Sequence, residues 1–119
     1  MADAKELVKA AYRALDSKKG ENIKIIDISN VSVIADYFII ANGSNQNQVQ
    51  ALVDQVQEEL YKMGHEPIQV EGYMTGSWIL MDYRDIIVHV FSKEDRLFYD
   101  LERIWRDGIE LTEKDMECL

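Results

Sequence analysis

The chain has 119 residues, of which 47% are hydrophobic and 29% are charged. These values are typical of one folded domain and argue against disorder over most of the chain. Its 22 acidic and 13 basic residues give a net charge of −9, which argues against a broad nucleic-acid-binding face. Such a charge favours basic partners, and the alternative is that it only keeps the protein soluble. A single cysteine excludes an internal disulfide and a cysteine-based metal site. No apolar run is long enough to span a bilayer. We therefore expect a cytoplasmic protein with no cofactor, metal or membrane contact.

The first third of the chain contains one predicted helix and two predicted strands. Residues 3–18 are expected to be helical, because Asp3 and Glu6 form a capping-box pattern and apolar residues recur at helical spacing. Partial alternation predicts a strand over residues 22–29. Residues 36–42 form an unbroken run of strand-forming residues, which is typical of a strand that is buried on both faces.

The clearest helix of the sequence follows Gly43. Either Ser44 or Asn45 can cap its N-terminus, and Gly64 stands where a left-handed residue commonly ends a helix. Its apolar side consists of residues at intervals of three or four, namely Val49, Leu52, Val53, Val56, Leu60 and Met63.

Three more strands are predicted over residues 67–71, 77–83 and 85–91. Pro67 favours an edge position for the first of them, because proline cannot donate a hydrogen bond to a neighbouring strand. The other two are separated by so few residues that they should form an antiparallel hairpin.

Ser92 is expected to cap a last helix, whose apolar side would carry Leu97, Phe98, Leu101, Ile104 and Trp105. Residues 107–119 are mostly polar and acidic and are expected to form a mobile tail. We therefore predict one domain over residues 1–106, of the α/β class (an α+β sandwich), with a mixed sheet of about five strands that carries helices.

Two stretches of the sequence resemble the ribosomal silencing factor family, which is also called Iojap-like. The first is DYFIIANGS at residues 36–44, and the second comprises WILMDY and DIIVHVF within residues 78–91. With the flanking sequence, the likeness covers residues 3–106. The family commonly has glycine where this chain has Arg84, which predicts a different turn or a strained arginine, and it often has serine where Asn45 stands.

The resemblance implies a factor that binds the large ribosomal subunit at ribosomal protein L-fourteen. Bound there, such a factor sterically blocks joining of the small subunit and represses translation. Together with the negative net charge, this leads us to expect no direct nucleic-acid binding beyond incidental contact with ribosomal RNA.

The family's fold is related to that of nucleotidyltransferases, so a nucleotide-binding enzyme is the alternative function. Such enzymes hold Mg²⁺ with two carboxylates that lie one residue apart on a strand, downstream of a Gly-Ser at a helix start. Here Ser44 follows Gly43 before a helix, but the strand after Asp85 carries no second carboxylate, and Asp82 lies across a turn. We therefore expect a nucleotidyltransferase-like fold without the catalytic carboxylates.

Alternation divides the side chains of the tryptophan-containing strand between two faces. Ile79 and Met81 are suited to the core, which places Trp78, Leu80 and Asp82 on the opposite face. There they would offer a basic partner two apolar anchors and a carboxylate. The alternative is that a helix covers this face and that Trp78 belongs to the core.

The last predicted helix carries Arg96, Tyr99 and Glu102 at intervals of three. These residues would form either a polar rim for the same partner or a solvated face with local ion pairs. His89 alternates with valines and is expected to be a satisfied structural histidine. An exposed apolar face or a free edge strand could also support a homodimer.

Overall fold

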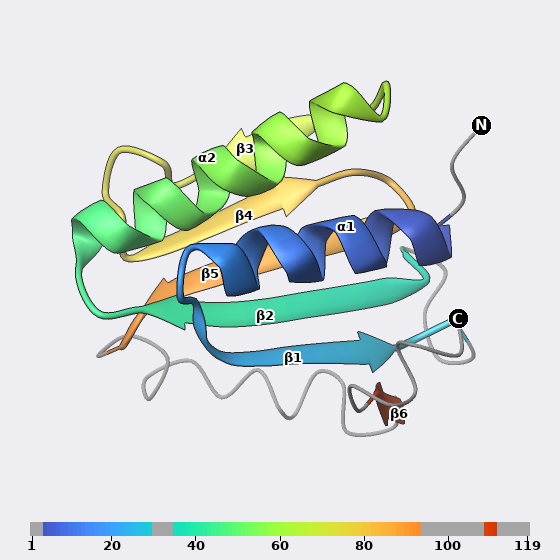
Figure 1. The fold of residues 1–119 in the computed structure, drawn as a ribbon, viewed down its shortest axis with the longest axis horizontal. Helices are drawn as coiled ribbons and strands as arrows, with labels where there is room; N and C mark the ends of the chain where they lie inside the picture. The colour runs from blue at the N-terminus through green and yellow to red at the C-terminus, as the bar shows by residue number, and fades with distance from the viewer. Residues whose placement is uncertain (1–3, 30–34, 94–108, 112–119) are drawn as a thin grey trace.

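The computed structural model describes residues 4–29, 35–93 and 109–111 (Figure 1). The elements occur in the order α1 (Ala4–Ser17), β1 (Glu21–Asp27), β2 (Tyr37–Gly43), α2 (Gln46–Lys62), β3 (Gln69–Glu71), β4 (Trp78–Asp82), β5 (Ile86–Ser92) and β6 (Ile109–Leu111). Within these residues, no helix combines the length and the apolar character that crossing a membrane requires.

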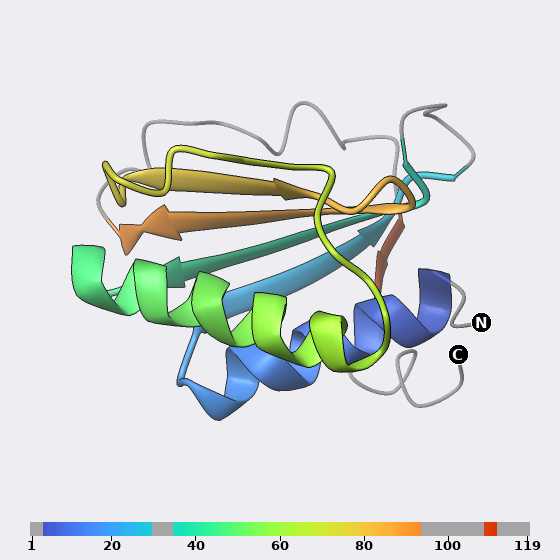
Figure 2. The same cartoon turned by 90° about the horizontal axis from the view of Figure 1, so that it is seen from above.

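The strands form one mixed sheet in the order β3-β4-β5-β2-β1-β6. Strands β2 and β5 pair in parallel, and the other neighbouring strands pair antiparallel. Both helices lie on the same face of the sheet (Figure 2). The α/β class, the mixed sheet, the hairpin and the edge position of β3 are therefore confirmed.

The prediction of a tail over residues 107–119 is wrong for Ile109–Leu111, which form β6. This strand pairs antiparallel with β1, where Leu111 lies opposite Ile25, and Leu111 also packs against the core. Three residues are too few for alternation to be recognised in a sequence. The sheet thus extends beyond the predicted boundary at residue 106, and the rest of the predicted tail lies outside the described residues.

A side-chain cap begins α2, and residues with left-handed backbone conformation follow the ends of both helices. The Asn45 side chain accepts a hydrogen bond of 2.9 Å from the backbone N–H of Gln48, so Asn45 rather than Ser44 caps α2. Gly64 ends α2 with φ +86°, as predicted. At the end of α1 the left-handed residue is Lys19, with φ 61°, and Gly20 follows it.

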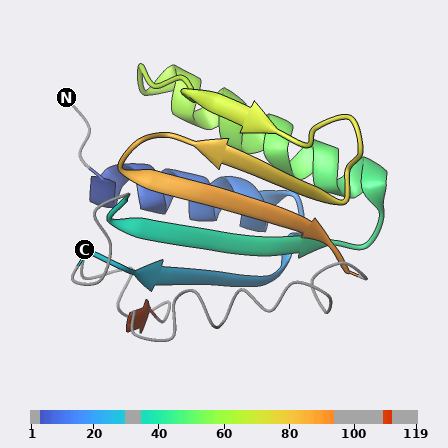
Figure 3. The same ribbon diagram turned by 180° about the vertical axis from the view of Figure 1, so that it is seen from behind.

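The core has two parts, one on each face of the sheet. Between the sheet and the helices lies the larger cluster, which includes Leu7, Leu15, Leu52, Leu60, Ile79 and Met81. On the opposite face, seen from the front in Figure 3, a smaller cluster comprises Ile26, Ile28, Ala35, Ile40, Ile87 and Phe91. The central strands β2 and β5 are consequently buried on both faces, as the unbroken apolar run of β2 predicted.

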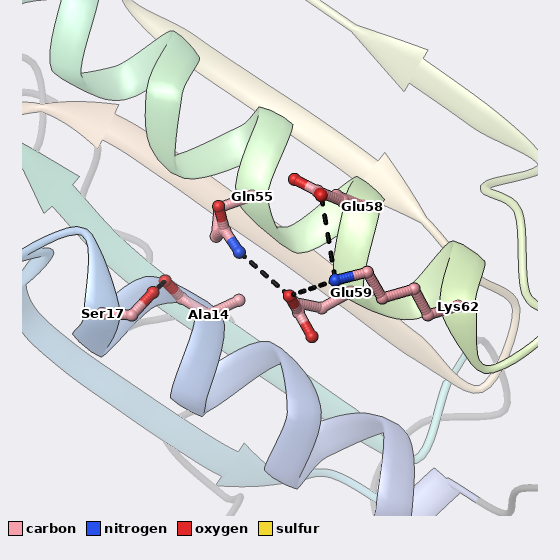
Figure 4. A network of polar contacts seen from close by, with 6 residues as sticks. All are labelled: Ala14, Ser17, Gln55, Glu58, Glu59 and Lys62. Atoms are coloured by element: carbon pink, nitrogen blue, oxygen red, sulfur yellow. Dashed lines mark hydrogen bonds and ion pairs between the residues drawn. The ribbon is translucent and has the colours of Figure 1, made fainter.

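The exposed side of α2 near α1 carries a small polar network (Figure 4). Gln55 donates a hydrogen bond of 3.1 Å to Glu59, and the Lys62 ammonium lies 3.4 Å from Glu59 and 3.8 Å from Glu58. Lys62 and Glu58 are largely solvated and Glu59 is half-buried, so each ion pair stabilises the fold only slightly.

Candidate protein-binding surface

Strand β4 divides its side chains between the two faces of the sheet. Ile79 and Met81 point toward the helices and are 0% exposed. Trp78, Leu80 and Asp82 lie on the face opposite α1 and α2, which we call the outer face, and each is only half-buried. This confirms the predicted division of the strand, whereas a role of the outer-face residues in binding stays a prediction.

The indole ring of Trp78 is held by two residues of β5. In the sheet register Trp78 lies directly opposite Phe91, and the two rings stack with centroids 5.2 Å apart. The indole N–H donates a hydrogen bond of 3.2 Å to Nδ1 of His89. Trp78 is therefore partly a packing residue and partly a surface residue, which lies between the two alternatives drawn from the sequence.

Asp82 has a structural role that the sequence did not indicate. Its carboxylate accepts a hydrogen bond of 2.8 Å from the backbone N–H of Arg84. Arg84 has φ 75°, and the Asp85 N–H donates to the Tyr83 carbonyl at 2.9 Å, which is the geometry of a strained classic γ-turn. The expectation of a strained arginine is thus confirmed, and Asp82 supports the turn that contains it.

Two residues of β3 extend the outer face toward the edge of the sheet. Glu71 pairs with Leu80 and Gln69 pairs with Asp82, and directly opposite residues of antiparallel strands share a face. Both β3 residues are exposed. Leu80 therefore has two acidic neighbours on this face, Glu71 directly opposite it and Asp82 two residues further along β4, and the first of these appears only once the register of β3 against β4 is known.

The turn from β3 into the following loop requires glycine at position 72. Gly72 has φ +80°, and a Cβ atom there would lie 2.1 Å from the Trp78 carbonyl oxygen. Only a residue without a side chain allows the backbone to pass so close to the start of β4. Gly72 thus helps to set the position of Trp78 relative to Glu71.

The loop between β3 and β4 is fastened to α2 by side-chain hydrogen bonds. Gln46 donates to the Met74 carbonyl at 3.1 Å, and Gln50 donates to the Tyr73 carbonyl at 2.8 Å. The Tyr73 hydroxyl donates to Asp54 at 3.0 Å, and this hydrogen bond raises the pKa of Tyr73. These contacts anchor the loop just ahead of Trp78.

His89 lies on the outer side of β5 and is 6% exposed. The Phe38 ring approaches it edge-on, with centroids 5.1 Å apart, and burial lowers the pKa of His89 to about 4. Its Nε2 is buried and has no hydrogen-bond partner in the described part of the chain. The predicted structural role fits this burial, but the expectation that the ring is fully satisfied is wrong for Nε2.

Half of the predicted site cannot be compared with the structure. Residues 94–108 lie outside the described residues. This range includes Arg96, Tyr99 and Glu102 and the helix expected to carry them. Their assignment to the partner-binding surface stays a prediction.

The geometry does not assemble the site of a nucleotidyltransferase. Ser44 follows the end of β2, whereas Asp85 lies beside its beginning, because parallel pairing places Tyr37 opposite Ile86 and Gly43 opposite Ser92. A seven-residue strand, roughly 20 Å long, therefore separates the two groups. Among the described residues, no three His, Cys, Asp or Glu side chains gather in a way that could hold a metal ion.

Comparison with known proteins agrees with the resemblance seen in the sequence. A family model described as "Ribosomal silencing factor during starvation" matches residues 1–118. The chain belongs to this family. Its members are described as ribosomal silencing factors and not as enzymes, in agreement with the expected absence of catalysis.

Similar bacterial proteins and a solved structure cover most of the chain. Ribosomal silencing factor RsfS of Halalkalibacterium halodurans is 38% identical over 103 residues, covering 87% of this chain and 88% of the relative. RsfS of Bacillus subtilis is 37% identical over 104 residues, with the same coverage. A crystal structure of a protein from Chromobacterium violaceum is similar with a TM-score of 0.85 and 34% identity, over 88% of each chain.

Proposed function

We propose that the protein binds the large ribosomal subunit through ribosomal protein L-fourteen and blocks joining of the small subunit. Membership of the ribosomal silencing factor family supports this proposal, because that family's implied activity is ribosome binding without catalysis. The proposal further assigns the contact to the outer face of β4 and its border with β3.

The observation that carries the assignment is the combination of apolar and acidic groups at one edge of the sheet. Trp78 and Leu80 are half-buried on the outer face, and Leu80 has Glu71 directly opposite it on β3 and Asp82 two residues further along β4. Such a surface offers anchors that lose water on binding, next to charges that can pair with lysine or arginine. A contact of about 800 Å² on each partner is enough for a specific complex.

The proposed mechanism is steric. A body of 13.8 kDa bound to the joining face of the large subunit occupies volume that the small subunit needs. No bond is made or broken, so the extent of repression depends only on occupancy of the site. The net charge of −9 favours encounter with basic ribosomal proteins, and binding should weaken as salt is raised.

Sedimentation with purified large subunits tests the site. We expect the wild-type protein to pellet with the subunits and Trp78→Ala to remain in the supernatant. Tyr61→Ala is a matched control, because Tyr61 is an aromatic residue that is 64% exposed on α2, away from the outer face. A wild-type protein that does not pellet contradicts the function, and a Trp78→Ala variant that pellets normally contradicts the site.

Asp82 needs a variant that separates its charge from its role in the turn. Asp82→Asn keeps an oxygen that can accept the Arg84 N–H but removes the negative charge. We expect this variant to fold normally and to bind large subunits more weakly, with a smaller salt dependence than the wild type. Equal binding by Asp82→Asn and the wild type would remove Asp82 from the interface.

Three further predictions belong to the proposal. We assign the polar rim of the contact to Arg96, Tyr99 and Glu102. We place the protein in the cytoplasm. The third prediction is that the same apolar residues can also form a homodimer. Light scattering over a range of concentrations tests the dimer. Substitution of the three rim residues by alanine, followed by sedimentation, tests the rim.

A further inference from the structure

The contact between Trp78 and His89 joins a half-exposed ring to a buried one. The indole N–H donates to Nδ1 of His89 at 3.2 Å, while the indole face stacks on Phe91 at 5.2 Å. The stacking restrains the plane of the indole, and the hydrogen bond restrains its rotation within that plane. Together the two contacts favour one orientation of the Trp78 side chain.

The protonation of His89 follows from this hydrogen bond. Because Nδ1 accepts the indole proton, the proton of the neutral imidazole must reside on Nε2. Nε2 is buried and has no acceptor among the described residues. A buried N–H without an acceptor destabilises the folded state.

A hydrocarbon side chain at position 89 would avoid this cost. The surroundings would suit one, because His89 is 6% exposed and its neighbours on the outer face include Phe38, Ile40 and Phe91. What phenylalanine or leucine could not supply is an acceptor for the indole N–H. The feature that distinguishes histidine here is therefore its Nδ1 atom.

We propose that His89 is a positioning residue for partner binding, whose Nδ1 holds the indole of Trp78 in the orientation that the partner meets. The inference rests on the proposed function, because it takes Trp78 as the anchor of the interface. An aromatic anchor that is already fixed in its bound orientation loses less conformational entropy on binding than a mobile one. Loss of the acceptor should therefore weaken binding even though His89 itself is buried.

The test compares substitutions that keep or remove the acceptor. His89→Phe and His89→Leu remove it and fill the site with apolar atoms, whereas His89→Asn can place an amide oxygen near the position of Nδ1. We expect the Phe and Leu variants to bind purified large subunits about tenfold more weakly than the wild type, and the Asn variant to recover part of that loss.

The indole N–H resonance of Trp78 provides a spectroscopic readout. The chain has two tryptophans, so Trp78→Phe assigns the two indole signals in a ¹⁵N–¹H spectrum. In His89→Phe we expect the Trp78 signal to shift and its proton to exchange faster with water. An unchanged signal would show that the hydrogen bond does not hold the ring and would overturn the inference.

A double-mutant cycle separates positioning from a general structural effect. If His89 acts through the indole N–H, His89→Phe should weaken binding in the wild-type background and have no further effect in the Trp78→Phe background. Equal weakening in both backgrounds, or no weakening in the wild type, overturns the inference. Normal binding by Trp78→Ala would instead contradict the proposed site itself, so the two failures are distinguishable.

Discussion

The two faces of β4 show how five consecutive residues serve two purposes. Toward the helices, Ile79 and Met81 are completely buried in the larger core cluster. Toward the outer face, Trp78, Leu80 and Asp82 remain half-buried at the border with the exposed β3. The same alternation that builds the core therefore places a candidate interface one residue away from it, and substitutions on the two faces should have separable effects.

The largest difference is expected between two neighbouring residues. Met81→Ala removes completely buried atoms and should lower the free energy of unfolding by about 2–5 kcal/mol. Leu80→Ala should cost about 1 kcal/mol, because Leu80 is only half-buried, but it should weaken binding to large subunits. Urea unfolding and sedimentation of both variants check this comparison, which fails if Leu80→Ala destabilises the fold as much as Met81→Ala.

The second prediction concerns the buried histidine of the outer face. Burial lowers the pKa of His89 to about 4, so between pH 6.5 and pH 4 the unfolded chain binds a proton that the folded protein excludes. The free energy of unfolding should therefore fall by about 3 kcal/mol from this group as the pH is lowered through that range, and should not depend on it above pH 6.5. Urea unfolding of the wild type and of His89→Phe measures the effect, because only the wild type carries it. Parallel pH profiles would contradict the prediction.

The third prediction concerns Arg84, in the turn that follows β4. Arg84→Gly should raise the free energy of unfolding by about 0.5–1 kcal/mol, because φ 75° costs an arginine energy that glycine does not pay. Arg84→Ala is the matched control, since it removes the same charge but keeps the strain. Thermal unfolding should show stabilisation by glycine alone, and equal stabilisation by alanine would point to charge as the cause.

The smallest effect is expected for a polar contact that belongs to neither face of β4. Lys62→Ala breaks the ion pairs with the exposed Glu58 and the half-buried Glu59. Because Lys62 itself is largely exposed, the free energy of unfolding should change by less than about 0.5 kcal/mol. Chemical unfolding at low and high salt measures it. A loss above 1 kcal/mol would show that the network of Figure 4 contributes as much as the half-buried outer face.

Much of the fold could be predicted because it depends on local periodicity. The burial of β2 on both faces, the apolar side of α2 and the division of β4 all follow from spacing along the chain. β6 could not be found in this way, since three residues show no periodicity and their pairing with β1 is nonlocal.

Only those features of the site that depend on alternation within a single strand could be predicted. Alternation selected Trp78, Leu80 and Asp82, but the pairing of Leu80 with Glu71 and the bond from Trp78 to His89 depend on the register between strands. The support that Asp82 gives to Arg84 depends on the type of turn, which the alternation of the two flanking strands does not specify.

The parallel pairing of β2 with β5 also bears on how the chain folds. The β1–β2 hairpin and the meander of β3, β4 and β5 are each built from strands close in sequence, whereas the pairing that unites them joins residues about fifty positions apart, such as Tyr37 and Ile86. Closing that long loop costs entropy before the central strands can be buried. During synthesis the central β2–β5 pairing consequently cannot form until β5 has left the ribosome, and the pairing of β1 with β6 must come later still.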